Sequence, residues 1–254
     1  RAAKNFGIYK NIPEVLSISL GAAETTLLKL TNAYCSFING GVKVEPILID
    51  RIQDRRGKTI FNADKRTCVG CEEISYLKED MPKIMDRRTQ ILSPETAYQM
   101  TSLLEGVVKR GTGRKLRFLK LPLAGKTGTT NNNMDAWFIG FTSNLVIGVY
   151  VGFDEPKTLG KYETGAKAAL PIFKKIIQNT IKKSEVFPFK IPENISLVIV
   201  DYETGKPVNL INNKSIYESF KSKNSSYIDL ENSLNINTLG THSTGINKKI
   251  LRLY

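Results

Sequence analysis

The chain has 254 residues, which is enough for one large domain or for one domain with a small appendage. Apolar residues make up 41% of the sequence, so it can form a hydrophobic core, and a wholly disordered protein is excluded. The formal net charge is +13, nearly all of it in residues 1–185, which suggests an anionic partner: nucleic acid, an acidic lipid or a carboxylate-bearing polymer. No finger, recognition helix or aromatic–basic repeat is present, so we expect no nucleic-acid binding.

The first residue is Arg1 rather than Met, and it lies within a segment that has the composition of a folded domain. We therefore expect a fragment of a longer chain. No run of residues approaches the ~20 apolar residues of a membrane span, and the sequence shows no signal-peptide pattern.

The cysteines do not favour a metal site. Cys35 falls on the apolar face of an expected helix, where a core position is expected. Cys68 and Cys71 have the spacing of a metal knuckle or a redox pair, but no second Cys/His pair accompanies them, and the sole histidine, His242, is distant. We expect a local disulfide or two free thiols, and neither a metal nor a cofactor.

The first ninety residues are expected to hold one helix and one hairpin. Apolar residues recur at three- and four-residue steps before Gly40-Gly41, which is typical of a helix with a glycine stop. The expected elements are a helix over residues 24–39, a hairpin with strands at 48–49 and 59–61 and a turn at 54–58, and an irregular segment over 62–90.

The clearest helix begins at Ser93-Pro94-Glu95. Serine is a favoured N-cap, proline suits the first helical position, and a carboxylate is stabilised at the positive end of the helix dipole. Lys109-Arg110-Gly111 ends the helix, with cations at the negative end and glycine beyond it. We interpret this helix as a packing element.

The remaining pattern predicts an antiparallel sheet followed by a helix. The link at residues 142–144 is short enough only for a hairpin, and Pro171 lies near the first turn of the helix or at a kink. The expected elements are strands over 121–127, 135–142 and 145–153, a helix over 166–183, a short strand over 196–202, and a poorly ordered polar tail over 211–247. The fold class is therefore α+β, an antiparallel β-sheet flanked by helices, with residues 1–185 as the main body and 186–254 as a small β unit with an Asn/Ser/Lys-rich tail.

Lys126-Thr127-Gly128 is the most informative segment, and three interpretations compete. A phosphate-binding loop would need glycine at position 120 and a helix directly after the motif; Lys120 and a run of Thr and Asn stand there, which excludes it. An exposed strand without a role is the second interpretation. The third is the active-site strand of a serine acyltransferase, in which Lys-Thr-Gly accompanies Ser-x-x-Lys and Ser-x-Asn motifs.

Each residue of the motif suits a peptide substrate with a terminal carboxylate. Lys126 places positive charge near that carboxylate and helps to tune proton transfer, and the hydroxyls of Thr127 and Thr129 can hydrogen-bond to it. Gly128 lets the acyl group approach the backbone, and the Thr129 N–H can donate to a developing oxyanion, a contribution of about 3–4 kcal/mol. The peptide would lie along the strand as an added β-partner. We expect Lys126 and Thr129 to be catalytic, and Thr127, Gly128 and Thr130 to bind substrate.

Several separate stretches, in the same order and spacing, resemble the transpeptidase domain of class A (bifunctional) penicillin-binding proteins, the 1A type in particular. The resemblance covers residues 5–185, and Ile195–Gly205 is similar to the family's short carboxy-terminal region. The matching stretches are Leu20-Gly21-Ala22 through Asn39-Gly40-Gly41, Leu92-Ser93-Pro94-Glu95 through Gly111-Thr112-Gly113, Lys126 to Phe141, and Gly148 to Asp154 with Glu163-Thr164-Gly165.

The resemblance implies a serine-type DD-transpeptidase that cross-links peptidoglycan stem peptides ending in D-Ala-D-Ala and is acylated by β-lactams. It further implies the penicillin-binding and serine β-lactamase type of fold, other cell-wall synthesis proteins as partners, and the periplasmic face of a bacterial inner membrane. Full-length members add an amino-terminal membrane anchor and a glycosyltransferase domain.

In the family, the Ser-x-x-Lys nucleophile motif and the Ser-x-Asn motif precede the matched region, so we expect no nucleophile in this chain and an inactive fragment. Ser75-Tyr76-Leu77-Lys78, Ser222-Lys223-Asn224 and Ser233-Leu234-Asn235 fit the patterns only by spacing. A Ser-His-Asp triad is implausible because His242 lies in the polar tail. Two alternatives remain open: a non-catalytic remnant of a split gene that binds the wall or a partner, and a DD-carboxypeptidase on the same fold.

Overall fold

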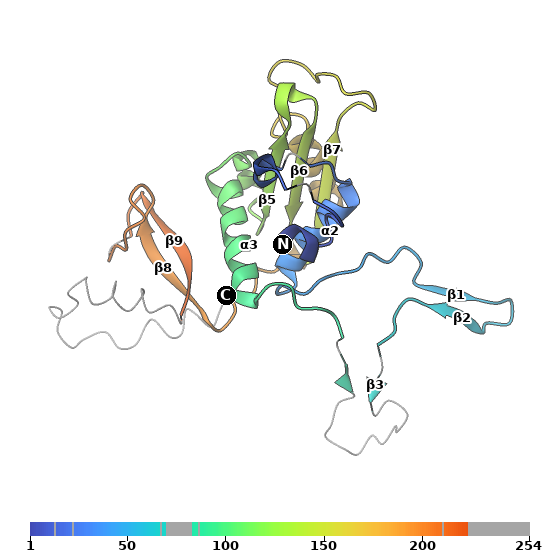
Figure 1. Ribbon diagram of the computed structural model, residues 1–254. Helices are drawn as coiled ribbons and strands as arrows, with labels where there is room; N and C mark the ends of the chain where they lie inside the picture. The colour runs from blue at the N-terminus through green and yellow to red at the C-terminus, as the bar shows by residue number, and fades with distance from the viewer. Residues whose placement is uncertain are drawn as a thin grey trace, which may run out of the picture.

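A computed structural model describes residues 1–12, 14–21, 23–66, 68–69, 83–85, 87–209 and 211–222. Its centre is a three-stranded antiparallel sheet in the order β5-β6-β7, formed by Ala124–Thr129, Ala136–Phe141 and Val146–Val151 (Figure 1). Strand β5 begins three residues later than predicted because Pro122 has no N–H for a ladder bond, and it extends through Gly128 and Thr129, which pair with Trp137 and Ala136. The expected α+β fold is confirmed.

Two predicted helices, α2 (Leu27–Ile38) and α4 (Ala169–Thr180), cover opposite faces of this sheet. On one face, a Cβ at Gly148 of β7 would collide with Thr31 of α2. On the other face, a Cβ at Gly140 of β6 would lie 2.6 Å from the Phe173 ring of α4. Gly148 pairs with the neighbour of Gly140, and neighbouring strand residues face opposite sides, so each glycine allows one helix to approach closely.

The predicted start and end signals of helix α3 (Pro94–Lys109) are confirmed. The Ser93 hydroxyl accepts a hydrogen bond from the Thr96 N–H (3.3 Å), and the helix ends with Arg110 as its C-cap. Hydrogen bonds from its own backbone N–H, from the Ser93 hydroxyl and from the Asn194 amide hold the pKa of the Glu95 carboxyl below its ordinary value.

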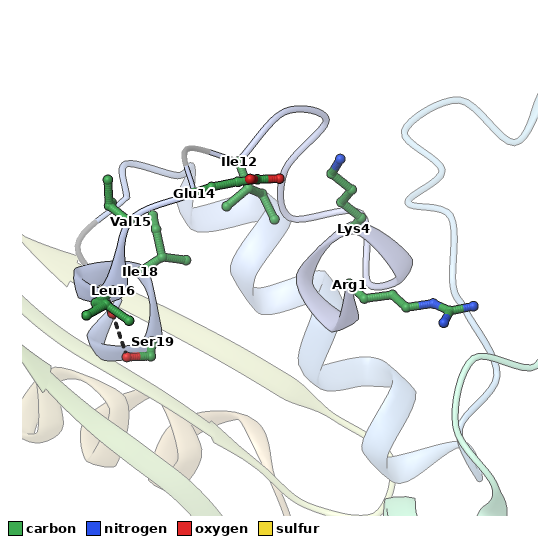
Figure 2. Close-up of a pocket in the computed structure, with 8 residues that line it drawn as sticks. All are labelled: Arg1, Lys4, Ile12, Glu14, Val15, Leu16, Ile18 and Ser19. Atoms are coloured by element: carbon green, nitrogen blue, oxygen red, sulfur yellow. Dashed lines mark hydrogen bonds between the residues drawn. The ribbon is translucent and has the colours of Figure 1, made fainter.

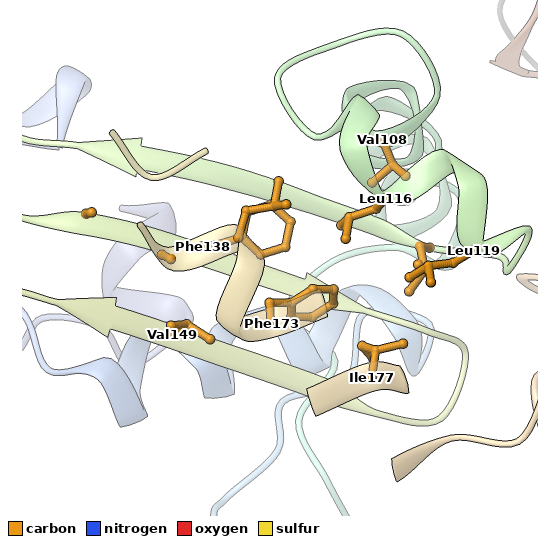
Figure 3. Close-up of a cluster of buried hydrophobic side chains, with 11 residues drawn as sticks. Val108, Leu116, Leu119, Phe138, Val149, Phe173 and Ile177 are labelled. Carbon is orange, nitrogen blue, oxygen red and sulfur yellow. The ribbon is translucent and has the colours of Figure 1, made fainter. Parts of the chain in front are cut away.

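The main hydrophobic core lies between the sheet and α4 and is closed at one end by the 3-10 helix η2 (Arg114–Leu119), as Figure 3 shows. Phe138 of β6 and Phe173 of α4 are fully buried, with their rings edge to face at 4.8 Å. Each large side chain of this kind contributes about 1.5–3 kcal/mol when buried. The core members are Val108, Leu116, Leu119, Leu123, Ala136, Phe138, Val149, Ala169, Leu170, Phe173 and Ile177.

A smaller core joins α2 and α3 to the start of the sheet. Leu104 of α3 and Phe141 of β6 are buried there, and the Tyr34 ring of α2 packs against Phe141 at 6.1 Å. Cys35 is half-buried rather than fully buried as expected; its Sγ donates to the Thr31 carbonyl (3.8 Å), and burial raises the pKa of the thiol.

The predicted hairpin is present, but its first strand lies later in the chain than the predicted residues 48–49. Strands β1 (Arg51–Gln53) and β2 (Thr59–Asn62) pair directly beside the turn, because Asp54 Oδ1 accepts from the Arg56 and Lys58 N–H groups and fixes the turn there. Within the segment expected to be irregular, β3 (Cys68–Val69) pairs with β4 (Lys83–Ile84). Figure 1 shows both pairs extending away from the central sheet.

The other short helical elements are α1 (Ala2–Asn5), η1 (Leu16–Leu20), η3 (Asn131–Asn133) and η4 (Lys183–Glu185). Across the stretches for which the structure gives coordinates, none of the helices has the length and apolar character that a bilayer span requires.

A further antiparallel hairpin, β8 (Ile195–Asp201) with β9 (Ser215–Lys221), follows the main body. The prediction of a poorly ordered tail from residue 211 is therefore wrong for the residues that form β9. The strand docks on α3: the Gln99 amide of α3 donates to the backbone carbonyl of Ser219 (3.0 Å), and Lys221 Nζ donates to Thr96 Oγ1 (2.8 Å). Composition alone does not reveal such a contact with a distant helix.

Candidate active site

Lys126, Thr127, Gly128 and Thr129 occupy the last four positions of β5, which is an edge strand of the central sheet. The first two residues of β5, Ala124 and Gly125, are buried, whereas Lys126 and Thr129 are exposed and Thr127 is half-buried. The part of β5 that carries the motif is therefore open to solvent.

The backbone of β5 presents alternate residues to the open edge. The Thr130 N–H donates to the Asp135 carbonyl (3.1 Å) across the β5–β6 connection. Because hydrogen-bonded and non-hydrogen-bonded pairs alternate in an antiparallel ladder, Gly128 and Lys126 also bond to β6. The N–H and C=O groups of Thr127 and Thr129 therefore point away from β6, where an added strand can reach them.

Lys126 and Thr127 form a small polar cluster on this edge. Lys126 Nζ donates to the Thr127 carbonyl (2.7 Å), so the ammonium group lies at the backbone group that faces solvent. The Thr127 hydroxyl lies 2.9 Å from that of Thr112, which follows α3. Thr112 is a site residue that the sequence analysis did not identify, although Gly111-Thr112-Gly113 was among the matching stretches.

Thr129 is held by the loop between β7 and α4. The Gly165 N–H donates to Thr129 Oγ1 (3.1 Å). This bond uses the side chain of Thr129, and its backbone N–H points to the open edge because of the ladder register. Gly165 packs against paired backbone: a Cβ would lie 2.5 Å from the Gly128 carbonyl oxygen and would collide with that of Trp137. Gly165 belongs to another of the matching stretches, and nothing local in the sequence indicates which backbone it contacts.

Beyond Thr129 the chain turns back through hydrogen bonds that fix the end of the strand. Thr130 Oγ1 accepts from the Asp135 N–H (2.8 Å), so this hydroxyl supports the β5–β6 connection. The Tyr150 hydroxyl donates to Asp135 Oδ1 (2.8 Å), and this bond raises the pKa of Tyr150. The Trp137 ring, half-buried, packs on Tyr150 at 4.8 Å. Asp135 and Trp137 thus stiffen the sheet next to Gly128.

The other candidate residues from the sequence do not reach β5 or lie outside the described residues. Ser222 Oγ lies 3.0 Å from Ser196 Oγ at the end of the β8–β9 hairpin. Cys71, Ser75, Lys78, Ser233, Asn235 and His242 lie outside the described residues. Where the structure describes the chain, no serine or cysteine side chain is hydrogen-bonded to Lys126, Thr127 or Thr129, and no cluster of three or more His, Cys, Asp or Glu residues is placed to hold a metal ion.

A hollow of about 700 Å³ lies elsewhere, between α1 and η1 near the amino terminus (Figure 2). Its charged residues are Arg1, Lys4 and Glu14, and the Ser19 hydroxyl in its wall donates to the Leu16 carbonyl (2.7 Å). None of its lining residues comes from β5. We therefore place the site on the open edge of β5, where the chemical groups are, rather than in the hollow.

The sequence matches the penicillin-binding protein transpeptidase domain over residues 4–178. The chain belongs to the penicillin-binding protein transpeptidase family. Penicillin-binding protein 1A of Rickettsia prowazekii is 43% identical over 230 residues, which cover 87% of this chain and 28% of that protein. Penicillin-binding protein 1A of Pseudomonas aeruginosa is 33% identical over 249 residues, covering 86% of this chain and 30% of that protein.

The crystal structure of penicillin-binding protein 1A from Haemophilus influenzae has a TM-score of 0.67 to this chain at 30% identity, over 87% of this chain and 35% of that one. The resemblance seen in the sequence is confirmed. The chain spans about 30% of the length of the curated 1A-type relatives it matches.

Proposed function

We propose that this chain is the part of a serine-type DD-transpeptidase that holds the carboxylate end of a D-Ala-D-Ala stem peptide during peptidoglycan cross-linking. The observation that carries the proposal is the open half of β5, on which Lys126 Nζ and the outward backbone groups of Thr127 and Thr129 lie together. In this pose the Lys126 ammonium and the Thr127 hydroxyl receive the terminal carboxylate, and the peptide pairs with β5 as an added strand.

The reaction itself needs a hydroxyl nucleophile, which we propose comes from polypeptide outside residues 1–254. The serine oxygen attacks the carbonyl of the penultimate D-Ala, and the Thr129 N–H donates to the oxyanion that forms. The C–N bond then breaks and the terminal D-Ala leaves with a proton. An amine on a neighbouring stem takes the acyl group and restores the serine hydroxyl.

Further parts of the proposal concern the whole protein. We propose that it also carries a glycosyltransferase domain and a membrane anchor, acts on the outer face of a bacterial inner membrane and works with other cell-wall synthesis proteins. The family membership and the share of the 1A-type relatives that this chain spans support this proposal.

The first test is binding of acetyl-(acetyl)Lys-D-Ala-D-Ala to residues 1–254, compared with the same peptide bearing a carboxy-terminal amide. The free acid should bind more tightly, and Lys126→Ala should remove the preference because the ammonium group is lost. Equal binding of acid and amide would contradict the proposed pose. In the full-length protein, Lys126→Ala should lower the rate of acylation by a β-lactam by orders of magnitude.

The second test concerns the nucleophile. Residues 1–254 alone should form no covalent adduct with a fluorescent penicillin, with an intact penicillin-binding protein as the positive control. A stoichiometric label on residues 1–254 would show that the chain supplies its own nucleophile.

A further inference from the structure

The loop between β7 and α4, residues 152–168, lies at the carboxyl end of β5 (Figure 1). Two hydrogen bonds attach this loop to neighbouring elements. The Leu159 N–H donates to the Asn133 carbonyl (2.9 Å), which ties the loop to η3. The Gly165 N–H donates to Thr129 Oγ1 (3.1 Å), which ties it to β5.

A peptide bound in the proposed pose runs toward this loop. Its carboxylate lies at Lys126 and Thr127, and its scissile carbonyl lies at the Thr129 N–H. The peptide therefore runs along β5 with its carboxyl end at Lys126 and its amino-terminal part toward Thr129. The opposite direction is closed, because Ala124 and Gly125 are buried and α3 contacts β5. The residues on the amino-terminal side of the scissile bond therefore continue past Thr129.

The exposed ring of Tyr162 in this loop has two lysine ammonium groups close to it. Tyr162 is 61% exposed. Its φ is +73°, which is uncommon for a residue other than glycine. The Thr164 N–H donates to the Tyr162 carbonyl (2.9 Å) and supports this conformation. Lys161 Nζ and Lys167 Nζ lie 5.3 and 5.4 Å from the centre of the ring.

Within the part of the chain that the structure describes, neither Lys161 nor Lys167 forms an ion pair. The loop carries the cations Lys157, Lys161 and Lys167 and the carboxylates Asp154, Glu155 and Glu163, so its formal net charge is zero. Two of these cations lie close to the one ring of Tyr162. A cation on an aromatic face keeps its ability to bind a carboxylate.

We propose that Lys161, Tyr162 and Lys167 form a subsite for a carboxylate that the peptide carries on the amino-terminal side of its scissile bond. This inference rests on the proposed function, and it makes the loop a determinant of specificity for acidic peptides. Two exposed ion pairs together correspond to an affinity change of about two- to thirtyfold.

The test uses residues 1–254 and two acetylated synthetic tetrapeptides that end in (acetyl)Lys-D-Ala-D-Ala and differ only in a first residue of Glu or Gln. Calorimetry at low salt measures both dissociation constants. The variant Lys161→Ala/Lys167→Ala removes the subsite, and Lys115→Ala/Lys175→Ala is the matched control, because it removes two exposed lysines from η2 and α4.

The wild-type chain should bind the Glu peptide about two- to thirtyfold more tightly than the Gln peptide. Lys161→Ala/Lys167→Ala should abolish this difference without changing the affinity for the Gln peptide, and the control pair should retain it. Equal affinities in the wild type, with both lost in Lys126→Ala, would overturn the subsite and leave the proposed function standing. No binding by the wild type, or binding that Lys126→Ala does not weaken, would overturn both.

Discussion

Replacing Gly165 with alanine should displace the β7–α4 loop from β5. The φ of Gly165 lies outside the left-handed region, so alanine can adopt its backbone conformation and the cost is steric. The new Cβ would lie 2.5 Å from the Gly128 carbonyl oxygen and would collide with that of Trp137. Both oxygens belong to paired strands, so they cannot rotate away, and the loop has to move.

The expected loss has two parts. Overpacking at a close contact costs about 1–3 kcal/mol. Displacement of the loop also breaks the hydrogen bond from the Gly165 N–H to Thr129 Oγ1, which contributes about 0.5–1.5 kcal/mol. The free energy of unfolding should therefore fall by about 1.5–4.5 kcal/mol in Gly165→Ala.

Urea denaturation of Gly165→Ala, Thr129→Val and the double variant measures both parts. Thr129→Val removes the acceptor at nearly constant volume and isolates the hydrogen bond. Since Gly165→Ala already breaks that bond, adding Thr129→Val should cost almost nothing more, and the two losses should not add. A loss below about 0.5 kcal/mol in Gly165→Ala, or fully additive losses, would refute the proposed contact.

Three further predictions concern the core and two carboxylates. Phe138→Ala should lower the free energy of unfolding by about 3–5 kcal/mol because the ring is fully buried, and Phe138→Leu, which refills most of the space, should cost less in the same urea titration. Asp135→Asn should lower the pKa of the Tyr150 hydroxyl toward its ordinary value, because the carboxylate that accepts the hydrogen bond from this hydroxyl is lost. An unchanged absorbance titration of Tyr150 would contradict this. The Glu95 carboxyl has a depressed pKa, so its contribution to stability is present above pH 4.5, its ordinary pKa, and is lost as the pH falls through the folded value. Asn194→Ala should raise that pKa in an NMR titration and shrink the acid-dependent loss.

Sequence reasoning succeeded where the information is local. The signals that define α3, from the cap at Ser93 to the cations after Lys109, lie within a few residues of the ends they specify. Strand β5 was located within three residues, and the error came from Pro122, whose missing N–H keeps it out of the ladder.

The larger failures come from contact between distant segments. Strand β9 has a polar composition, and its docking on α3 depends on Gln99, more than a hundred residues earlier. Thr112 and Gly165 meet Thr127 and Thr129 only after folding brings three segments together. The motif located the site, but its supporting residues had to be read from the structure.

The edge of β5 that is free to receive a peptide is equally free to receive another molecule of the same protein. Edge strands of this kind promote sheet-to-sheet aggregation unless a charge discourages it. Lys126 stands on the open half of this edge, so antiparallel self-pairing centred on it would bring two ammonium groups together. The side chain proposed to select an anionic ligand would thereby also keep copies of the chain apart, and its loss would lower colloidal stability as well as affinity.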